Sequence, residues 1–576
     1  MTDVAAEPDV RVPLMVGAIG HRDLVASELD VLRTRVREFL ERLQSKYPDL
    51  RVTLLTSLAD GADRLVGDVA QSLRTPIVYV LPMPSDLYEC DFGAESRAEY
   101  REILGSNDVL TLPLVGDNTA DDVTHPGPQR DLQYAQLGAF IAAHSHILLA
   151  LWDGRENGGS GGTAQIIRYH QDDYMPVLAD DEPRPRIDDA DDESDLVYHV
   201  VCSRDRADGA PAAPLRAGDA WWFTRDETEP RTREMPDRYF IVLNRMVEFS
   251  RDVQRYRERI RRADNHLLPA EPAFEIREGD REIGSMFATA DWLAKRYQRM
   301  TLIALRLIFG FAAFAGVAFT AYGDLPQQEL MIYPYLLFIA AMLATAQAAQ
   351  SGAWQRKYVD YRVLAEALRV QFYWAIAGVE RPAPSRFGHD AFLKREDLEI
   401  GWLRNILRIA GRRDDAGGRT PRNEGIDVAV RDWVGDDHIG QLSYYRRRWS
   451  TLLFRHKVTA ALDRFQFAAG LAIAAWLASA HYWFASEPTD IWIALMGILP
   501  LAAGLRQAYA HRVAERELIL QFQYMDRVMT NARRRLLRTT QPSERRRILR
   551  ELGDAALHEN GQWILRLRER PIAAPS

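Results

Sequence analysis

The second half of the chain contains four long apolar runs, at residues 301–322, 330–350, 465–485 and 491–505. A helix needs roughly 20 mainly apolar residues to cross the hydrocarbon core of a bilayer. Three of the runs reach that length, and residues 507–510 can extend the fourth. Short loops join the runs into two pairs. We therefore predict four transmembrane helices arranged as two hairpins.

Each pair of apolar runs is followed by a similar segment. RVLAEALRVQF occupies residues 362–372, and RVAERELILQF occupies residues 512–522. An offset of 150 residues aligns the two segments, which predicts that this half is a duplication of one unit. The identical residues include Arg362 and Arg512, Val363 and Val513, Leu368 and Leu518, Gln371 and Gln521, and Phe372 and Phe522.

Apolar residues recur at helical spacing around both segments. We expect amphipathic helices at 354–374 and 504–525, with Leu368 and Leu518 on the faces that pack. The two copies should then associate within the chain as a pseudo-twofold unit. Four spanning helices are too few to enclose a wide aqueous pore, so conduction would require a homo-oligomer.

Positive charge predicts the orientation of the hairpins. The loops inside them, at 323–330 and 486–490, contain no Lys or Arg. By the positive-inside rule these loops face outward and both termini lie in the cytoplasm. Buried helices of a soluble core are the alternative, but they would not require this asymmetry. The basic residues on the outer flanks include Lys295, Arg296, Arg299, Arg356, Lys357, Arg446, Arg447, Arg448, Arg455, Lys457, Arg506 and Arg512.

Composition limits the remaining possibilities. A chain of 576 residues can hold about three domains. The formal net charge of −8 argues against a nucleic-acid partner, because nucleic-acid-binding domains are usually basic. Cys90 and Cys202 are too few for a disulfide framework or a metal site, so we expect no metal and no cofactor. Residues 1–10 lack the basic and apolar regions of a signal peptide, so we expect no cleaved signal.

The first half alternates β-rich and helical patterns. Helical stretches such as 26–46 and 129–143 separate the apolar runs. This alternation predicts an α/β fold with a doubly wound, Rossmann-like parallel sheet, in which ligands bind beyond the carboxyl ends of the strands. The expected strands lie within residues 12–20, 51–58, 75–83, 108–115 and 146–154.

Glycine-containing turns follow three of these strands. GAIGHRDL spans 17–24, SLADGADRL spans 57–65, and WDGRENGGSGGTAQII spans 152–167. Such turns let the backbone approach a ligand, and free N–H groups there can bind phosphate. One such motif is usually structural, but three in one sheet favour nucleotide binding. The candidate ligand-binding residues are Gly17, Gly20, His21, Arg22, Asp23, Ser57, Asp60, Gly61, Ala62, Asp63, Pro82, Asp153, Gly154, Gly161, Gly162, Thr163 and Arg204.

These motifs resemble those of the SLOG superfamily, Rossmann-like domains related to the LOG nucleoside-monophosphate hydrolases and to DprA. The resemblance covers about residues 12–170. The repeated hairpins with their amphipathic helices resemble SLATT domains, two-helix membrane effectors often joined to SLOG sensors in bacterial conflict systems. The resemblance implies an anti-phage, abortive-infection type of effector in the bacterial inner membrane. In such a protein a nucleotide second messenger binds the SLOG-like domain, and the transmembrane region then perturbs the membrane.

One departure from the resemblance concerns catalysis. Hydrolytic LOG enzymes carry an acidic residue just after the threonine of their glycine-rich loop, whereas Thr163 is followed by Ala164 and Gln165. Glycosidic hydrolysis needs a carboxylate, and Asp60, Asp63 or Asp153 would have to supply it. We therefore favour a binding protein over an enzyme. A membrane-tethered nucleotide-processing hydrolase of LOG type and a passive scaffold remain the alternatives.

These patterns give the expected domain boundaries. The acidic stretch at 172–195 is expected to be a solvated surface loop. The expected divisions are a SLOG-like sensor at 1–255, a helical connector at 256–300, a first SLATT-like unit at 301–380, a connector at 381–445, a second SLATT-like unit at 446–535 and a basic tail at 536–576.

Overall fold

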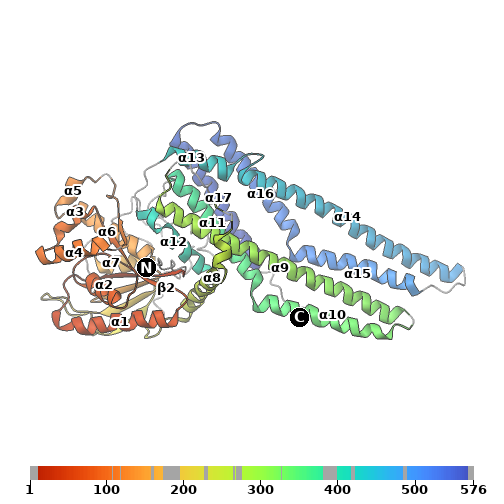
Figure 1. Cartoon of the computed structure of the whole chain (residues 1–576), viewed down its shortest axis with the longest axis horizontal. Coiled ribbons are helices and arrows are strands. Elements are labelled where there is room, and N and C mark those ends of the chain that lie inside the picture. Colours follow the sequence, from red (N-terminus) through yellow and green to blue (C-terminus); the bar gives the residue numbers. More distant parts are fainter. Residues whose placement is uncertain are drawn as a thin grey trace, which may run out of the picture. The chain divides into compact units, whose positions relative to one another are not determined.

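The computed structural model divides the chain into two compact units (Figure 1). The first comprises Met1–Asp264, Phe274–Thr289 and Gly378–Pro421, and the second comprises Asn265–Ala273, Ala290–Ala377 and Arg422–Ser576. The residues that the structure describes are 11–106, 108–116, 118–156, 161–172, 195–225, 231–263, 266–267, 275–325, 327–379, 398–416, 422–483 and 490–568.

A seven-stranded sheet forms the centre of the first unit. Its order is β4-β3-β2-β1-β5-β6-β7, and every neighbouring pair is parallel except β6 and β7. The mostly parallel Rossmann-like sheet predicted from the sequence is confirmed. The strands are β1 (Pro13–Gly20), β2 (Arg51–Thr56), β3 (Ile77–Leu81), β4 (Asp108–Thr111), β5 (Ile147–Trp152), β6 (Val197–Val201) and β7 (Ala220–Phe223).

Helices connect these strands, and their buried faces follow the helical period. In α1, the buried residues Leu32, Val36, Phe39 and Leu43 recur every three or four positions. Pro128 stands at the first position of α6, where a missing N–H group costs nothing. The helices of this part are α1 (Leu29–Lys46), α2 (Ala62–Ser72), α3 (Ser85–Tyr88), α4 (Ala94–Ser106), α5 (Ala120–Thr124), α6 (Pro128–Ala143), α7 (Thr163–Asp172) and α8 (Asp237–Arg261).

A helix from far along the chain also belongs to the first unit. This helix, α12 (Gly401–Ala416), lies within the stretch that the sequence suggested was a connector, and it is buried along most of its length. The Trp402 ring packs against Phe249 of α8 with 5.5 Å between centroids. At its other end, Arg413 pairs with Asp108 at 2.6 Å. The α/β unit is therefore completed by a segment that follows the first two membrane-length helices.

The second unit is entirely helical in its described part. Four helices are long and apolar enough to cross a membrane, namely α9, α10, α14 and α15, as the sequence predicted. The helix α9 begins among residues of the first unit and continues without interruption into the second. The helices are α9 (Glu278–Asp324), α10 (Ile332–Ser351), α11 (Trp354–Ala377), α13 (Asn423–Val428), α14 (Gly440–Trp483), α15 (Asp490–Arg512), α16 (Glu515–Leu536) and α17 (Pro542–Arg568).

The membrane-length helices contact one another in pairs (Figure 1). Phe314 of α9 stacks on Phe338 of α10 with 5.3 Å between ring centroids. On the other pair, Asp463 of α14 forms an ion pair with Arg506 of α15. The pairs also meet, since a Cβ placed on Gly316 of α9 would lie 2.3 Å from the Leu501 side chain of α15. Glycine at this position permits close approach of the two helices.

The helix after the first pair begins where the sequence predicted, at Trp354, whereas the helix after the second pair begins later than predicted, at Glu515. The chain breaks at Ala353, between α10 and α11, and again at Ala514, between α15 and α16, both with positive φ. These breaks are 161 residues apart, whereas the sequence alignment used 150. The predicted amphipathic helix at 504–525 is therefore wrong, because residues up to Arg512 belong to α15 and α16 begins at Glu515.

The periodicity of the helix explains this error. The two registers differ by 11 residues, which is about three turns, so both bring the same helix faces into alignment. In the new register the buried residues Met525, Met529, Ala532 and Leu536 of α16 match four buried residues of α11. Those four are Leu364, Leu368, Gln371 and Ala375.

Three truncations test this register. Leu368 and Met529 are almost completely buried, while Leu518 is only partly buried. Leu368→Ala and Met529→Ala should each cost about 2–5 kcal/mol of stability. Leu518→Ala should cost about half as much or less, because less apolar surface is lost. Thermal unfolding of the detergent-solubilised chain measures the order, and a larger loss from Leu518→Ala than from Met529→Ala would contradict the register.

Candidate functional site

The three glycine-turn motifs leave the sheet at one edge. They follow β2, β1 and β5, which are adjacent in the sheet, and the last residue of β1 is in register with Leu151 near the end of β5. In the sheet, β2 lies on one side of β1 and β5 lies on the other, so the strand order reverses direction at β1. Parallel α/β sheets bind ligands at such a switch point.

Two glycines allow the first two motifs to pack closely against each other. A Cβ on Gly20 would lie 2.4 Å from the Cβ of Ala62. Gly61 has φ +85°, and a Cβ there would lie 2.3 Å from the carbonyl oxygen of Arg22. The N–H of Ala62 donates to the carbonyl of His21 at 3.0 Å. The start of α2 is thus held against the turn after β1, and larger side chains at either glycine would separate them.

A group of polar side chains meets beside this contact. Ser57 donates a hydrogen bond to the Asp63 carboxylate, and the charge of Arg22 acts on both Asp63 and Tyr88. The Arg22 guanidinium lies 5.1 Å from the centre of the Tyr134 ring. We call Arg22, Ser57, Asp63, Tyr88 and Tyr134 the strand-edge cluster. Two charged groups and two phenols at a switch point provide both donors and an aromatic face.

Asp63 has the most altered acidity in the strand-edge cluster. Burial raises the pKa of its carboxyl to about 7, against the hydrogen bond from Ser57 and the charge of Arg22, which both lower it. The residue nevertheless remains partly accessible to solvent. A carboxyl that exchanges its proton near neutral pH can either donate or accept a hydrogen bond there. Such perturbed groups in a cleft are candidates for functional residues.

The Tyr88 hydroxyl was not identified from the sequence. The side chain is fully buried. Its oxygen makes no hydrogen bond of regular geometry among the described residues, but the Ser57 hydroxyl is close enough to oppose the rise in the Tyr88 pKa that burial causes. A buried hydroxyl with so weak a partner costs free energy. Nothing in the run SDLYECD marks Tyr88, because its position depends on how α3 folds back over the strand ends.

Tyr134 and its neighbours on α6 were also missed. Tyr134 donates to the Asp91 carboxylate, and the buried Arg130 pairs with the same carboxylate at 2.7 Å. These contacts orient the Tyr134 ring beneath Arg22. Arg130 and Tyr134 are four residues apart on a helix predicted from the sequence, so the sequence indicates that they share one face. The sequence does not indicate that this face lies near Arg22.

Several predicted ligand residues have partners within the protein. Asp23 pairs with Arg204 at 2.9 Å. Asp60 accepts a hydrogen bond from Ser96 at 2.6 Å. Asp153, which is buried, lies 3.2 Å from Nε2 of His21, and burial lowers the pKa of that histidine despite the nearby carboxylate. These side chains position the turns around the strand-edge cluster.

The remaining predicted residues shape the backbone. Gly17 lies within β1, where a Cβ would be 2.2 Å from the Ser145 hydroxyl. Pro82 is buried after β3. Gly154 has φ +78° and packs beneath Leu215. Gly17 and Gly154 therefore allow close packing at these positions.

The glycine-rich loop after β5 is only partly described. Its residues 157–160 lie outside the described part of the chain. The N–H of Gly161 donates to the Gln165 side chain at 2.6 Å, and the carbonyl of Gly162 accepts the N–H of Ile166 at 3.1 Å. Thr163 begins α7 and is buried. A Cβ on Gly161 would lie 3.0 Å from the backbone nitrogen of Ala135, so this loop adjoins Tyr134.

Comparison with protein-family models, with curated proteins and with solved structures finds no match. Within the described ranges, no group of three or more His, Cys, Asp or Glu side chains is placed to hold a metal ion. Function is therefore inferred from the site itself.

Asp63→Asn tests the environment of the strand-edge cluster. The carboxyl ordinarily has a pKa of 3.8, and in the folded chain the pKa is about 7. Between pH 3.8 and about 7 the folded chain binds the Asp63 proton more strongly than the unfolded chain does. The native carboxyl therefore lowers the free energy of unfolding as the pH rises, and the loss is largest above pH 7. The melting temperature of the variant minus that of the native chain should therefore be higher at pH 8 than at pH 5.

The variant is compared with the native chain at each pH because two buried histidines change the stability with pH in the opposite direction to Asp63. Burial lowers the pKa of His21 and of His146, so both add stability as the pH rises. Asp60→Asn on the same turn serves as the control. An equal difference at pH 5 and pH 8 for Asp63→Asn would contradict the assignment.

Proposed function

We propose that the α/β unit is a SLOG-like sensor of a nucleotide-derived messenger and that the helical unit is its membrane effector. The observation that carries this proposal is the strand-edge cluster, in which an arginine, a partly accessible carboxyl and two phenols meet at a switch point. Nucleotides present the complementary groups, namely phosphate, ribose hydroxyls and a planar base.

The chemistry of the strand-edge cluster suggests a role for each member. Arg22 would form charge-assisted hydrogen bonds to a phosphate. The Tyr134 ring, held by Asp91, offers a face for a base. Asp63 and Ser57 would hydrogen-bond to ribose or to the base edge. Tyr88 would gain a better-aligned hydrogen-bond partner than the Ser57 hydroxyl.

Four membrane-length helices support the effector half of the proposal. The hairpins and their following helices recur at a separation near 160 residues, which favours a duplicated, SLATT-like membrane unit. The basic flanks favour an orientation with both termini in the cytoplasm, and the membrane we propose is a bacterial inner membrane. Perturbing the bilayer would require several chains, assembled when bound ligand favours one of two states.

A nucleotide-processing hydrolase is the second candidate, and Asp63 is the observation that favours it. A carboxyl whose pKa is about 7 can transfer protons at neutral pH, as a general acid or base must. Incubation with nucleoside monophosphates or NAD separates the candidates. Release of free base that Asp63→Asn abolishes would establish the hydrolase, and binding without turnover would establish the sensor.

Calorimetric titration of the full chain with a panel of cyclic dinucleotides, cyclic ADP-ribose and nucleoside monophosphates tests the binding role. Arg22→Ala should weaken binding by about 1.5–3 kcal/mol, or roughly tenfold to a hundredfold, because a phosphate loses a charged donor. Arg33→Ala is the matched control, since Arg33 lies on α1 and pairs with Asp30 at 3.6 Å. Absence of binding by the whole panel, or unchanged affinity in Arg22→Ala, would contradict the proposal.

A further inference from the structure

The helix α14 carries an exposed apolar stripe where its apolar run begins. Phe454, Val458, Leu462 and Phe465 recur every three or four positions, which places them on one side of the helix. Each of these side chains is between 51 % and 69 % exposed. We call these four residues the α14 stripe. Large apolar side chains that gather on one face indicate a surface that contacts something outside the chain.

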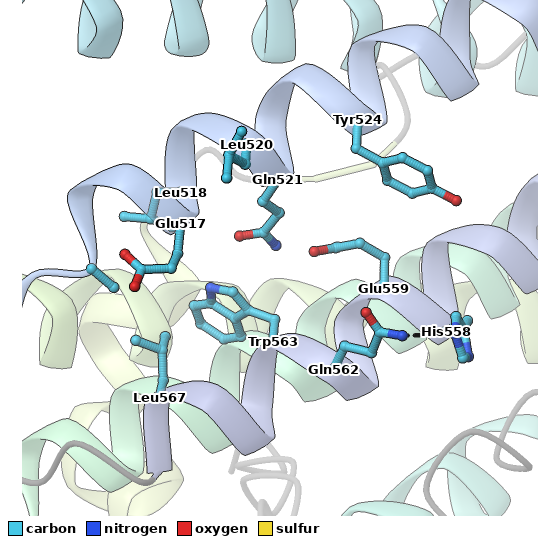
Figure 2. A pocket seen from close by; sticks show the side chains of 11 residues that line it. Glu517, Leu518, Leu520, Gln521, Tyr524, His558, Glu559, Gln562, Trp563 and Leu567 are labelled. Atoms are coloured by element: carbon cyan, nitrogen blue, oxygen red, sulfur yellow. Dashed lines mark hydrogen bonds between the residues drawn. The ribbon is translucent and has the colours of Figure 1, made fainter.

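The opposite side of α14 is covered by α16. The Phe522 ring of α16 lies 5.9 Å from the Tyr445 ring of α14, measured between centroids. On its other side α16 faces α17, and Figure 2 shows Gln521 and Trp563 directed into the pocket between those two helices. Both sides of α16 are therefore used within the helical unit, and the α14 stripe lies outside these contacts.

The matching positions of the first hairpin are buried. They lie 161 residues earlier, which is the separation of the two chain breaks, and none is more than 5 % exposed. The Tyr297 ring meets the Tyr361 ring of α11 with 5.7 Å between centroids. At the same face, Ala304 packs with Ala349 of α10. One hairpin thus covers this face with protein and the other leaves it exposed. The matching residues of α9 are Leu293, Tyr297, Thr301 and Ala304.

Exposed basic residues flank the α14 stripe without acidic partners. By the helical period, Arg455 falls on one side of the stripe, and Lys457 and Arg464 fall on the other. Within the described ranges, no carboxylate forms an ion pair with any of the three. The carboxylates at this level, Asp463 and Glu515, form their ion pairs on the covered side of α14. An apolar stripe between unpaired positive charges is typical of a helix face that binds an anionic lipid surface.

The length of α14 brings these charges to the level of the lipid headgroups. From Phe454 to Trp483 the helix is about 45 Å long. A bilayer with its headgroup layers is roughly 40–45 Å thick, and its hydrocarbon core takes about 30 Å of this. The α14 stripe therefore begins in the headgroup layer at one end of the span. There, basic side chains can reach lipid phosphates while apolar side chains contact the ends of the acyl chains.

We propose that the α14 stripe and its flanking bases bind anionic lipid headgroups of the cytoplasmic leaflet. This inference rests on the membrane role proposed for the helical unit. Lipid phosphates pair with Arg455, Lys457 and Arg464, and acyl chains cover Phe454 and Val458. A second copy of the chain fits this face less well, because a twofold contact would bring the same positive charges together. The second hairpin is thereby anchored by leaflet charge, whereas the first is held by protein contacts.

A fluorescent probe on the α14 stripe tests the proposal. Val458→Cys is labelled with nitrobenzoxadiazole in a Cys90→Ser background, because Cys90 is exposed and Cys202 is buried. The full chain is placed, one copy per disc, in phosphatidylcholine nanodiscs that contain an increasing fraction of phosphatidylglycerol. We expect the emission to shift to shorter wavelength as this fraction rises. An emission that does not depend on the fraction would overturn the proposal, whether protein or neutral lipid covers the probe or nothing does.

Two pairs of charge variants assign the lipid to this face. Lys457→Gln with Arg464→Gln should raise the phosphatidylglycerol fraction at half-maximal shift more than about tenfold, because two bases near the leaflet are lost. Arg534→Gln with Arg538→Gln changes the charge equally at exposed positions at the end of α16, and should leave that fraction unchanged. Equal effects of the two pairs would mean that net charge alone matters and would overturn the assignment.

Incorporation into neutral nanodiscs tests the membrane role separately. The chain and both pairs of variants should incorporate into phosphatidylcholine discs, because the membrane-length helices are unchanged. Failure of the native chain to incorporate would overturn both the membrane role and the lipid site. Incorporation without a shift that depends on phosphatidylglycerol would overturn the lipid site alone.

Discussion

The rest of the structure depends on the ion pairs that hold the first turns of α9 against α12 within the first unit. Arg277 lies 3.2 Å from Asp280 and 2.9 Å from Asp414, and both carboxylates are almost completely buried. Arg413 adds a contact to Glu282 at 2.8 Å. Burial raises the pKa of Asp280 and Arg277 opposes that shift. A buried carboxylate without its arginine is costly, so these helix ends are constrained to stay together.

The chain passes between the two units at several points. One lies within α9, which continues from these ion pairs to Asp324 as a single helix. Two more flank the segment that contains α12, which stands in the chain between α11 and α13.

Helices and strands that depend on a local sequence pattern could be predicted, whereas contacts between segments distant in the sequence could not. Apolar runs and strand-turn-helix patterns identified the parallel sheet and the four membrane-length helices. The helix predicted at 504–525 was wrong, because α15 continues to Arg512 and α16 begins at Glu515. The burial of α12 and the position of Tyr88 depend on packing between distant segments. At the site, Arg22, Ser57 and Asp63 were identified by motif, whereas Asp23 and Asp60 were assigned to ligand but pair within the protein.

Dye release from proteoliposomes tests most directly whether the two units act together. The full chain is reconstituted in bilayers that contain an entrapped dye, and the nucleotide panel is added to the side that the α/β unit faces. Our account predicts release that depends on a nucleotide and that Arg22→Ala shifts to higher nucleotide concentration. Release at the same rate with and without every nucleotide, or an identical response from Arg22→Ala, would contradict it.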